Sequence, residues 1–251
     1  MWGVGDVLVK DARALLSRGM IGDNVVNAYM KLLEKESERR RTLRATHAGT
    51  PGDIRRGGAY GGRLAHERRY MITSTYFHER EAGEPGRPWS RLWVGMTLDT
   101  LIIVPIHHNQ GSLHWKLGIV DLRRRVVMVL DSNQVGDDWK PDGLESAKRI
   151  TNAVDLGLKH LYEARLSEGG EDGLGGHSGM EGESDWTYAV PSWVPQQGKT
   201  MHCGAYVCVF ARQIVWGEKL RLKCDDAPAE REHMLRTICG KNDWGYVSLY
   251  D

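Results

Sequence analysis

Three short runs of β-forming residues follow one another closely in the middle of the chain, at residues 100–106, 115–120 and 126–130. Turn-forming residues separate them: Asn, Gly and Ser precede the second run, and a segment that begins with Asp121 precedes the third. The connections are too short to hold another element. The pattern therefore predicts that the three runs form the centre of a β-sheet.

Apolar residues recur at helical spacing on both sides of these strands. Asp23 is a candidate N-cap and Gly240 a candidate C-cap. Strand runs bracketed by helical runs predict an α+β domain, with helices flanking a central sheet. The predicted helices lie at residues 7–16, 23–35, 144–166, 204–216 and 227–239, and a further short strand is predicted at 186–194.

The length and charge of the chain narrow its class. With 251 residues, 41% of them hydrophobic, it can bury one sizeable core, and we expect a single domain over residues 1–251 that acts as a monomer. A formal net charge of +1 argues against a nucleic-acid or membrane-surface binder. No apolar run approaches the length of a membrane span, and the first residues lack a signal-peptide pattern. We therefore expect an intracellular protein.

Two segments have the composition of surface insertions. Residues 39–66 are rich in Arg and Gly and contain almost no large apolar residue, and residues 168–183 are Gly-rich and acidic. The Arg39-Arg40-Arg41 run at the start of the first segment is interpreted as the charged end of a helix rather than as a targeting signal. Both segments are expected on the surface of the domain.

The four cysteines are too few and too irregularly spaced for a disulfide scaffold in a chain of this length. They are expected to be thiols in a reducing compartment, the nucleus or the cytoplasm. They form no Cys-x-x-Cys pair, so we expect no structural zinc and no cofactor. Cys208, Cys224 and Cys239 fit ordinary packing roles.

Cys203 differs from the other cysteines because it lies at the start of a predicted helix. The free N–H groups and partial positive charge of a helix N-terminus favour a thiolate and bind an oxyanion. Gly204 follows directly and leaves room for a substrate backbone. Cys203 is therefore a candidate nucleophile.

A candidate base and its orienting carboxylate lie on the central strands. His114 opens one predicted strand and Asp131 closes the next, so the two side chains can meet at one end of the sheet. Asp121 is a competing carboxylate, although its place in a turn is a simpler explanation. From these residues alone, a Cys-His-Asp hydrolase and ordinary packing and turn roles are equally open.

At these residues the chain resembles the ubiquitin-like-protein-specific cysteine proteases that process and remove SUMO. The resemblance extends from about residue 7 to residue 239. The separations of 17 residues between His114 and Asp131 and of 6 between Gln197 and Cys203 agree with the pattern of that family. The matching blocks are residues 21–30, 102–106 with 114–115, 131–132, and 195–197 with 203–204.

The resemblance implies a papain-like cysteine protease fold in circularly permuted order, with the triad in the order His, Asp, Cys and a central mixed sheet. By this resemblance Cys203 is the nucleophile, His114 the general base and acid, and Asp131 the residue that orients His114. Gln197 is implied to donate its side-chain amide to the oxyanion, together with backbone N–H groups at Cys203.

The resemblance also implies a substrate channel. Trp115 is expected to line a narrow passage for an extended Gly-Gly tail, because only glycine lets a backbone pass between flat aromatic walls. Gly204 is expected to border the same site. The chain departs from the family in two places: Met20 stands where the second aromatic wall is usual, and His202 precedes the nucleophile where Asp is common.

The function implied is that of a cysteine protease or isopeptidase that cuts after the C-terminal Gly-Gly of a SUMO-like modifier, in deconjugation, precursor processing or both. Its partners would be the modifier and its conjugates, with no nucleic acid and no membrane. An alternative keeps the mechanism and changes the substrate to ubiquitin, another ubiquitin-like protein or a viral-type polyprotein. Alternatives of other classes are a non-catalytic ubiquitin-like binding module and acyl transfer to an amine.

Overall fold

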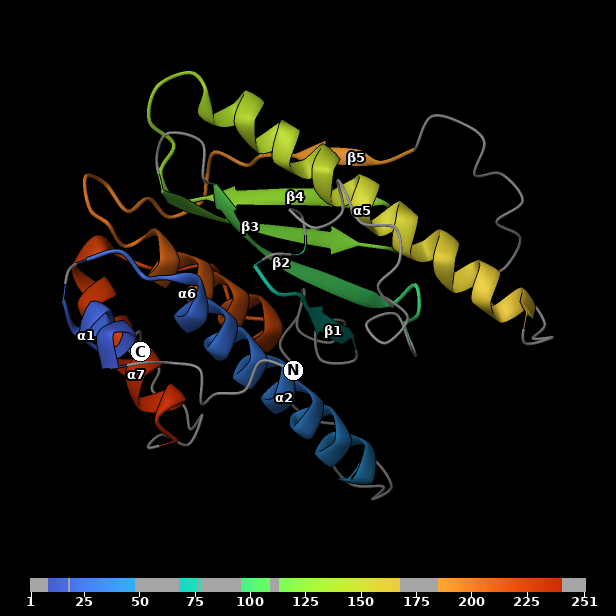
Figure 1. Cartoon of the computed structure of the whole chain (residues 1–251), viewed down its shortest axis with the longest axis horizontal. Coiled ribbons are helices and arrows are strands. Elements are labelled where there is room, and N and C mark those ends of the chain that lie inside the picture. Colours follow the sequence, from blue (N-terminus) through green and yellow to red (C-terminus); the bar gives the residue numbers. More distant parts are fainter. Residues whose placement is uncertain are drawn as a thin grey trace.

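The computed structural model describes residues 9–17, 19–47, 68–75, 77, 96–108, 113–167 and 185–240. In this part of the chain a five-stranded sheet has helices on both of its faces (Figure 1). The strands are β1 (Arg69–Ile72), β2 (Thr100–His108), β3 (His114–Asp121), β4 (Val126–Asp131) and β5 (Thr187–Ala189). The helices are α1 (Val9–Leu16), α2 (Asp23–His47), α5 (Trp139–Ser167), α6 (Cys203–Trp216) and α7 (Ala227–Ile238), with a short 3₁₀ helix η3 (Cys224–Asp226) before α7.

The sheet is mixed, as expected. Its order is β1-β2-β3-β4-β5; β3 is antiparallel to its neighbours β2 and β4, and the two outer strands are parallel to their neighbours. The antiparallel centre is the trio of strands that the sequence predicts. The α+β class and the central mixed sheet flanked by helices are therefore confirmed.

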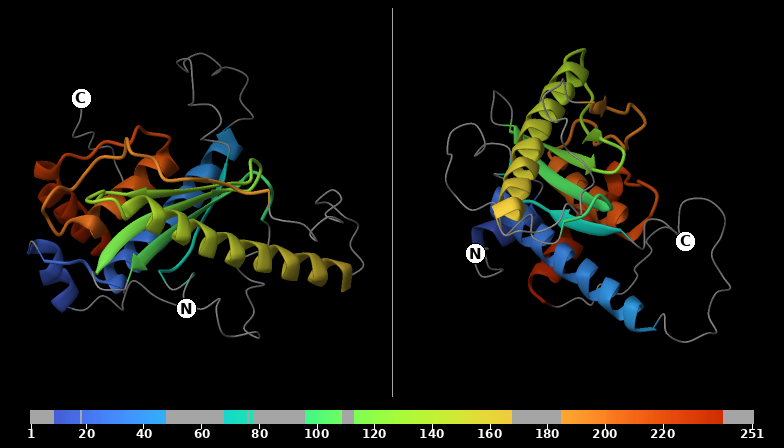
Figure 2. Two further views of the ribbon diagram at one scale, coloured as in Figure 1. Left: turned by 90° about the horizontal axis from the view of Figure 1, so that it is seen from above. Right: turned by 90° about the vertical axis from the view of Figure 1, so that its right-hand side faces the viewer.

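Successive side chains of β3 point to opposite faces of the sheet, and the core therefore has two layers. Trp115 and Leu117 pack with α2 and α6 on one face, whereas a Cβ atom added to Gly118 would collide with Ile150 of α5 on the other. Figure 2 shows α5 and α6 on opposite sides of the sheet. His114 and Lys116 are even-numbered like Gly118, so they share the face that α5 covers.

The second helix is longer than its apolar pattern indicates. The apolar pattern ends at residue 35, but α2 continues to His47; the arginine run is helical, as its interpretation as the charged end of a helix indicated. Glu36 pairs with Arg39 at 2.6 Å and with Arg40 at 2.8 Å, and the Arg40 guanidinium lies 4.1 Å from the ring centroid of Trp216. These i,i+3 and i,i+4 pairs support a polar helix that hydropathy does not reveal. Residues 48–66 and 168–183 lie outside the described residues.

Other boundaries shift for identifiable reasons. α5 begins at Trp139 instead of residue 144, because Pro141 falls in its first turn, where proline needs no amide hydrogen. β5 is shorter than the predicted strand, and β1 has no counterpart among the predictions. The predicted glycine cap after α7 is correct, since Gly240 has a φ of 67° and donates its N–H to Thr237 O. Over the described ranges, no helix has the length and apolar character that crossing a membrane requires.

Candidate active site

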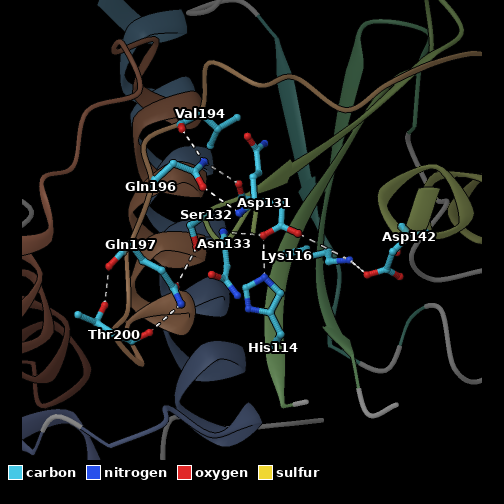
Figure 3. Close-up of polar contacts among 12 residues, drawn as sticks. His114, Lys116, Asp131, Ser132, Asn133, Asp142, Val194, Gln196, Gln197 and Thr200 are labelled. Atoms are coloured by element: carbon cyan, nitrogen blue, oxygen red, sulfur yellow. Dashed lines mark hydrogen bonds and ion pairs between the residues drawn. The ribbon is translucent and has the colours of Figure 1, made fainter. Parts of the chain in front are cut away.

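The ends of β3 and β4 bring the predicted base and carboxylate together. The antiparallel register sets Asp131 opposite Lys116, one β3 pleat from His114. His114 Nε2 and Asp131 Oδ1 are 2.7 Å apart, and the same oxygen accepts the Asn133 N–H at 2.8 Å (Figure 3). Asp131 is therefore held from two sides with one oxygen aimed at the imidazole.

His114 is surrounded by groups that favour its protonated form. Burial by itself would lower its pKa, but hydrogen bonds with Asp131 and Cys203, and the negative charges of those two groups, raise the pKa to about 9. Because Nε2 faces Asp131, Nδ1 is the ring nitrogen left for Cys203. The three residues thus form the chain of contacts that a Cys-His-Asp triad requires.

Cys203 is the first residue of α6, and its side chain is buried. Its neighbour Gly204 packs so closely that an added Cβ would lie 2.9 Å from Ile21 Cβ and 3.3 Å from Trp115 Cδ1. Any larger residue there would push the start of α6 off the sheet. Gly204 thus sets the position of Cys203 from the core side, and its predicted place beside the substrate remains a prediction.

Gln197 is fixed in the loop that precedes α6. Its backbone N–H donates to Ser132 O at 2.8 Å, its side-chain oxygen accepts the Ser132 hydroxyl at 3.1 Å, and its Nε2 donates to Thr200 O at 2.8 Å (Figure 3). An amide nitrogen carries two hydrogens, so one N–H remains after the bond to Thr200. The side chain is thereby pre-oriented, as an oxyanion donor needs to be.

Gln196 has a role that the sequence does not reveal. Its Nε2 donates to Asp131 O at 3.2 Å and to Val194 O at 2.8 Å, and its oxygen accepts the Gln134 N–H at 2.8 Å. The Tyr206 hydroxyl of α6 donates to Gln196 O at 3.0 Å. Gln196 therefore joins the end of β4 to the loop of Gln197 and to α6.

The predicted channel residues lie on the other face of β3. Trp115 is completely buried, its Nε1 donates to Ile21 O at 2.8 Å, and His107 stacks on its ring with centroids 4.4 Å apart. Met20 is partly exposed and directly precedes Ile21. A substrate tail could reach Trp115 only after its contacts with His107 or Ile21 open. The binding roles of Trp115 and Met20 stay predictions.

His202, the residue before Cys203, has the buried Arg231 as its partner. Arg231 of α7 donates from Nη1 to His202 Nδ1 at 3.3 Å, from Nε to Leu15 O at 2.9 Å and from Nη2 to Gly19 O at 2.6 Å. Burial lowers the pKa of Arg231, and the negative charge of Cys203 opposes that change. The pair thus links the end of α1 to the start of α6.

The competing carboxylate and the other cysteines lie outside the contacts of His114, Asp131 and Cys203. Asp121 ends β3 at the opposite end of the strand and pairs with Arg68 at 2.8 Å. Burial raises the pKa of Cys208, and Cys224 Sγ donates to Gln197 O at 3.2 Å. Within the part of the chain that the structure describes, no group of three or more His, Cys, Asp or Glu residues could hold a metal ion.

Comparisons with known proteins agree with this geometry. Residues 87–234 match the model of the Ulp1 protease family, C-terminal catalytic domain. Human sentrin-specific protease 2 is 22% identical over 232 residues, which cover 91% of this chain and 31% of the human protein, and the rat protein is 23% identical with the same coverage. The chain thus spans about a third of the length of these relatives.

Solved structures show the same fold. The SUMO protease Ulp1, with its catalytic cysteine oxidised to a sulfonic acid, aligns with a TM-score of 0.60 at 20% identity, covering 92% of this chain and 83% of that one. The Ulp1 protease domain in complex with SMT3, the yeast ortholog of SUMO, aligns with a TM-score of 0.56 at 20% identity, covering 93% and 82%. The predicted papain-like arrangement with the order His, Asp, Cys is thereby supported.

Proposed function

Because the chain belongs to the Ulp1 protease family, we propose that it is a cysteine protease that cuts after the C-terminal Gly-Gly of a SUMO-like modifier. The bond cut is the isopeptide bond of a conjugate or the peptide bond of a precursor. The relatives named for sentrin and SUMO support the modifier class. We infer further that it acts in an intracellular reducing compartment, because its four cysteines are free thiols.

The observation that carries the proposal is the linked set of Cys203, His114 and Asp131 at one end of the sheet. Asp131 Oδ1 lies 2.7 Å from His114 Nε2, and Cys203 is close enough to His114 to raise the pKa of the imidazole. A binding module that had lost catalysis would have no need to keep a thiol, an imidazole and a buried carboxylate in this order. The arrangement therefore favours an enzyme over a binding module.

The reaction follows from the geometry. The thiol proton of Cys203 passes to His114, and the sulfur attacks the carbonyl carbon of the last glycine. The carbonyl electron pair moves to oxygen, where the Gln197 amide and the N–H groups at the start of α6 stabilise it. The intermediate collapses to a thioester, and His114 gives its proton to the departing amine.

Water completes the cycle. His114, now neutral, takes a proton from a water molecule, and the hydroxide formed attacks the thioester carbonyl. Collapse of this second intermediate breaks the C–S bond and releases the glycine carboxylic acid, which loses its proton to solvent, while the Cys203 sulfur is freed beside His114. Because the His114 pKa is raised to about 9, its proton is in place for the leaving amine at neutral pH, and activity should decline as pH rises through about 9.

The test is covalent capture by electrophile-tipped SUMO, ubiquitin and NEDD8-type probes that each end in Gly-Gly. We expect intact mass to show one adduct with the SUMO-type probe, mapped to Cys203 by peptide analysis. Preferential capture by another probe would keep the mechanism and overturn the modifier assignment. If none of the probes reacts while iodoacetamide still modifies Cys203 in preference to Cys239, the thiol is activated for a different substrate, such as a polyprotein.

Gln197→Ala is expected to lower kcat by about 10²- to 10³-fold, the effect of removing one oxyanion donor, with little change in modifier affinity. The amide contacts the developing charge in the transition state and not the modifier body. Steady-state kinetics and titration with the modifier measure the two quantities. Gln134→Ala is the matched control, because the Gln134 amide donates to Pro191 O at 2.7 Å outside the triad. An equal loss of affinity and turnover in Gln197→Ala would contradict the oxyanion role.

A further inference from the structure

A buried lysine lies beside the triad. Lys116 follows His114 by two residues on β3, so both side chains share one face, and its cross-strand partner on β4 is Asp131. Only 1% of the Lys116 side chain is exposed. Removing an ammonium group from water costs free energy, so a buried lysine needs charged partners.

Two carboxylates receive it. Lys116 Nζ lies 3.7 Å from Asp131 Oδ2, the oxygen that does not face His114, and forms an ion pair with Asp142 in the first turn of α5 (Figure 3). The Asp142 side chain is 35% exposed. A line of alternating charge therefore runs from a solvent-facing carboxylate through Lys116 to the buried carboxylate that orients His114.

The charges of the site explain why a cation belongs there. The triad holds two acidic groups, the Asp131 carboxyl and the Cys203 thiol, and one basic group, His114, in a largely buried place. Lys116 adds a second basic group beside them. Asp142 then compensates part of the lysine charge, and the N-terminus of α5 stabilises a carboxylate at that position. The electrostatic effect of Lys116 on the triad therefore depends on Asp142, which does not touch the reacting atoms.

We propose that Lys116 is a positioning residue of the triad, which holds Asp131 with Oδ1 toward His114 and tunes the charge balance of the site, and that Asp142 sets the strength of this effect. The inference deepens the proposed function and rests on it. Its chemical claim concerns the reactivity of Cys203 and can be measured without any modifier.

Other charged and titratable groups pack near the pair and must be kept unchanged in the test. Cys203 on α6 and Asp131 on β4 contact His114 directly, His107 lies on the neighbouring strand β2, and Arg231 on α7 acts on Cys203 through His202. A change at Asp142 reaches the triad through its ion pair with Lys116.

The two ends of the line make opposite predictions. Lys116→Met removes a positive charge, so the Cys203 thiolate should appear, and the His114 imidazolium should persist, at higher pH than in the wild type. Asp142→Asn leaves the lysine charge less compensated, so both transitions should move to lower pH. We expect a shift of about one pH unit in each direction, the scale for a charge within several ångströms. The double variant should return toward the wild-type profile.

The primary measurement is the rate of iodoacetamide alkylation of Cys203 against pH, followed by intact mass and peptide mapping. The alkaline limb of kcat/KM with a Gly-Gly substrate, which reports His114, is the second. Glu145→Gln is the matched control. Glu145 is another acid near the start of α5, but it pairs outward with Arg149 at 3.2 Å, so its loss should leave both profiles unchanged.

Opposite shifts in the two variants, with an unchanged control, support the inference. Identical alkylation profiles in Asp142→Asn and wild type overturn it, and this variant keeps the test decisive even where Lys116→Met fails to fold. Shifts of the same sign in both variants also overturn it, because a purely structural disturbance has no reason to follow charge. Failure of every Gly-Gly probe would instead refute the proposed function and leave the alkylation result standing.

Discussion

Cys203→Ala is expected to abolish cleavage, with kcat falling about a millionfold, the scale on which loss of a catalytic nucleophile acts. Alanine removes the sulfur and adds no group that can attack a carbonyl. The fold should persist, because alanine is the best helix former and the side chain it replaces is small and buried at the start of α6. The variant should therefore bind substrate and hold it uncut.

Single-turnover cleavage, thermal unfolding and titration with the modifier separate these effects. Cys239→Ala is the matched control, because this exposed thiol follows α7 and lies outside the triad. Its turnover should equal that of the wild type. Residual cleavage by Cys203→Ala above about a thousandth of the wild-type rate would mean that another residue is the nucleophile.

Asp131→Asn is expected to lower kcat by about four orders of magnitude, as the equivalent change does in serine protease triads. The new amide can present its NH₂ group to His114 Nε2, which turns the acceptor there into a donor and imposes the wrong tautomer. The variant also removes the carboxylate whose hydrogen bond and charge raise the His114 pKa to about 9. The little activity that remains should therefore decline at lower pH than in the wild type.

A pH series of kcat/KM tests both parts of this prediction. Asp121→Asn is the matched control: it makes the same change at the opposite end of β3, where Asp121 pairs with Arg68 and not with the triad. It should leave kcat within about twofold of the wild type for the folded fraction. A loss of activity in Asp121→Asn as large as in Asp131→Asn would show that the effect comes from the sheet and not from the triad.

The predictable parts of the molecule are those encoded locally. The three central strands, α6 and the glycine cap after α7 follow from alternation, helical spacing and turn residues within short windows. The pairing of His114 with Asp131 could also be predicted from the sequence, because two consecutive antiparallel strands bring the start of one beside the end of the next. The role of Cys203 needed the family resemblance as well.

What the sequence did not predict depends on partners far away in the chain. Lys116 has the appearance of an ordinary polar residue on a strand until Asp142, 26 residues later, is folded over it. β1 is only four residues long and becomes a strand by pairing with β2. The extension of α2 rests on ion pairs and on Trp216 rather than on apolar periodicity. In each case tertiary contact overrides a weak local signal.

The hydrogen bonds of Arg231 affect how the protein folds during its synthesis. They join the last described helix to the end of the first across 216 residues of chain. Ribosomes deliver the N-terminal end first, at about 5 to 20 residues per second, so α1 emerges many seconds before the arginine that anchors it. Until Arg231 has been added to the growing chain, His202, the residue before Cys203, lacks the contact that ties it to the end of α1.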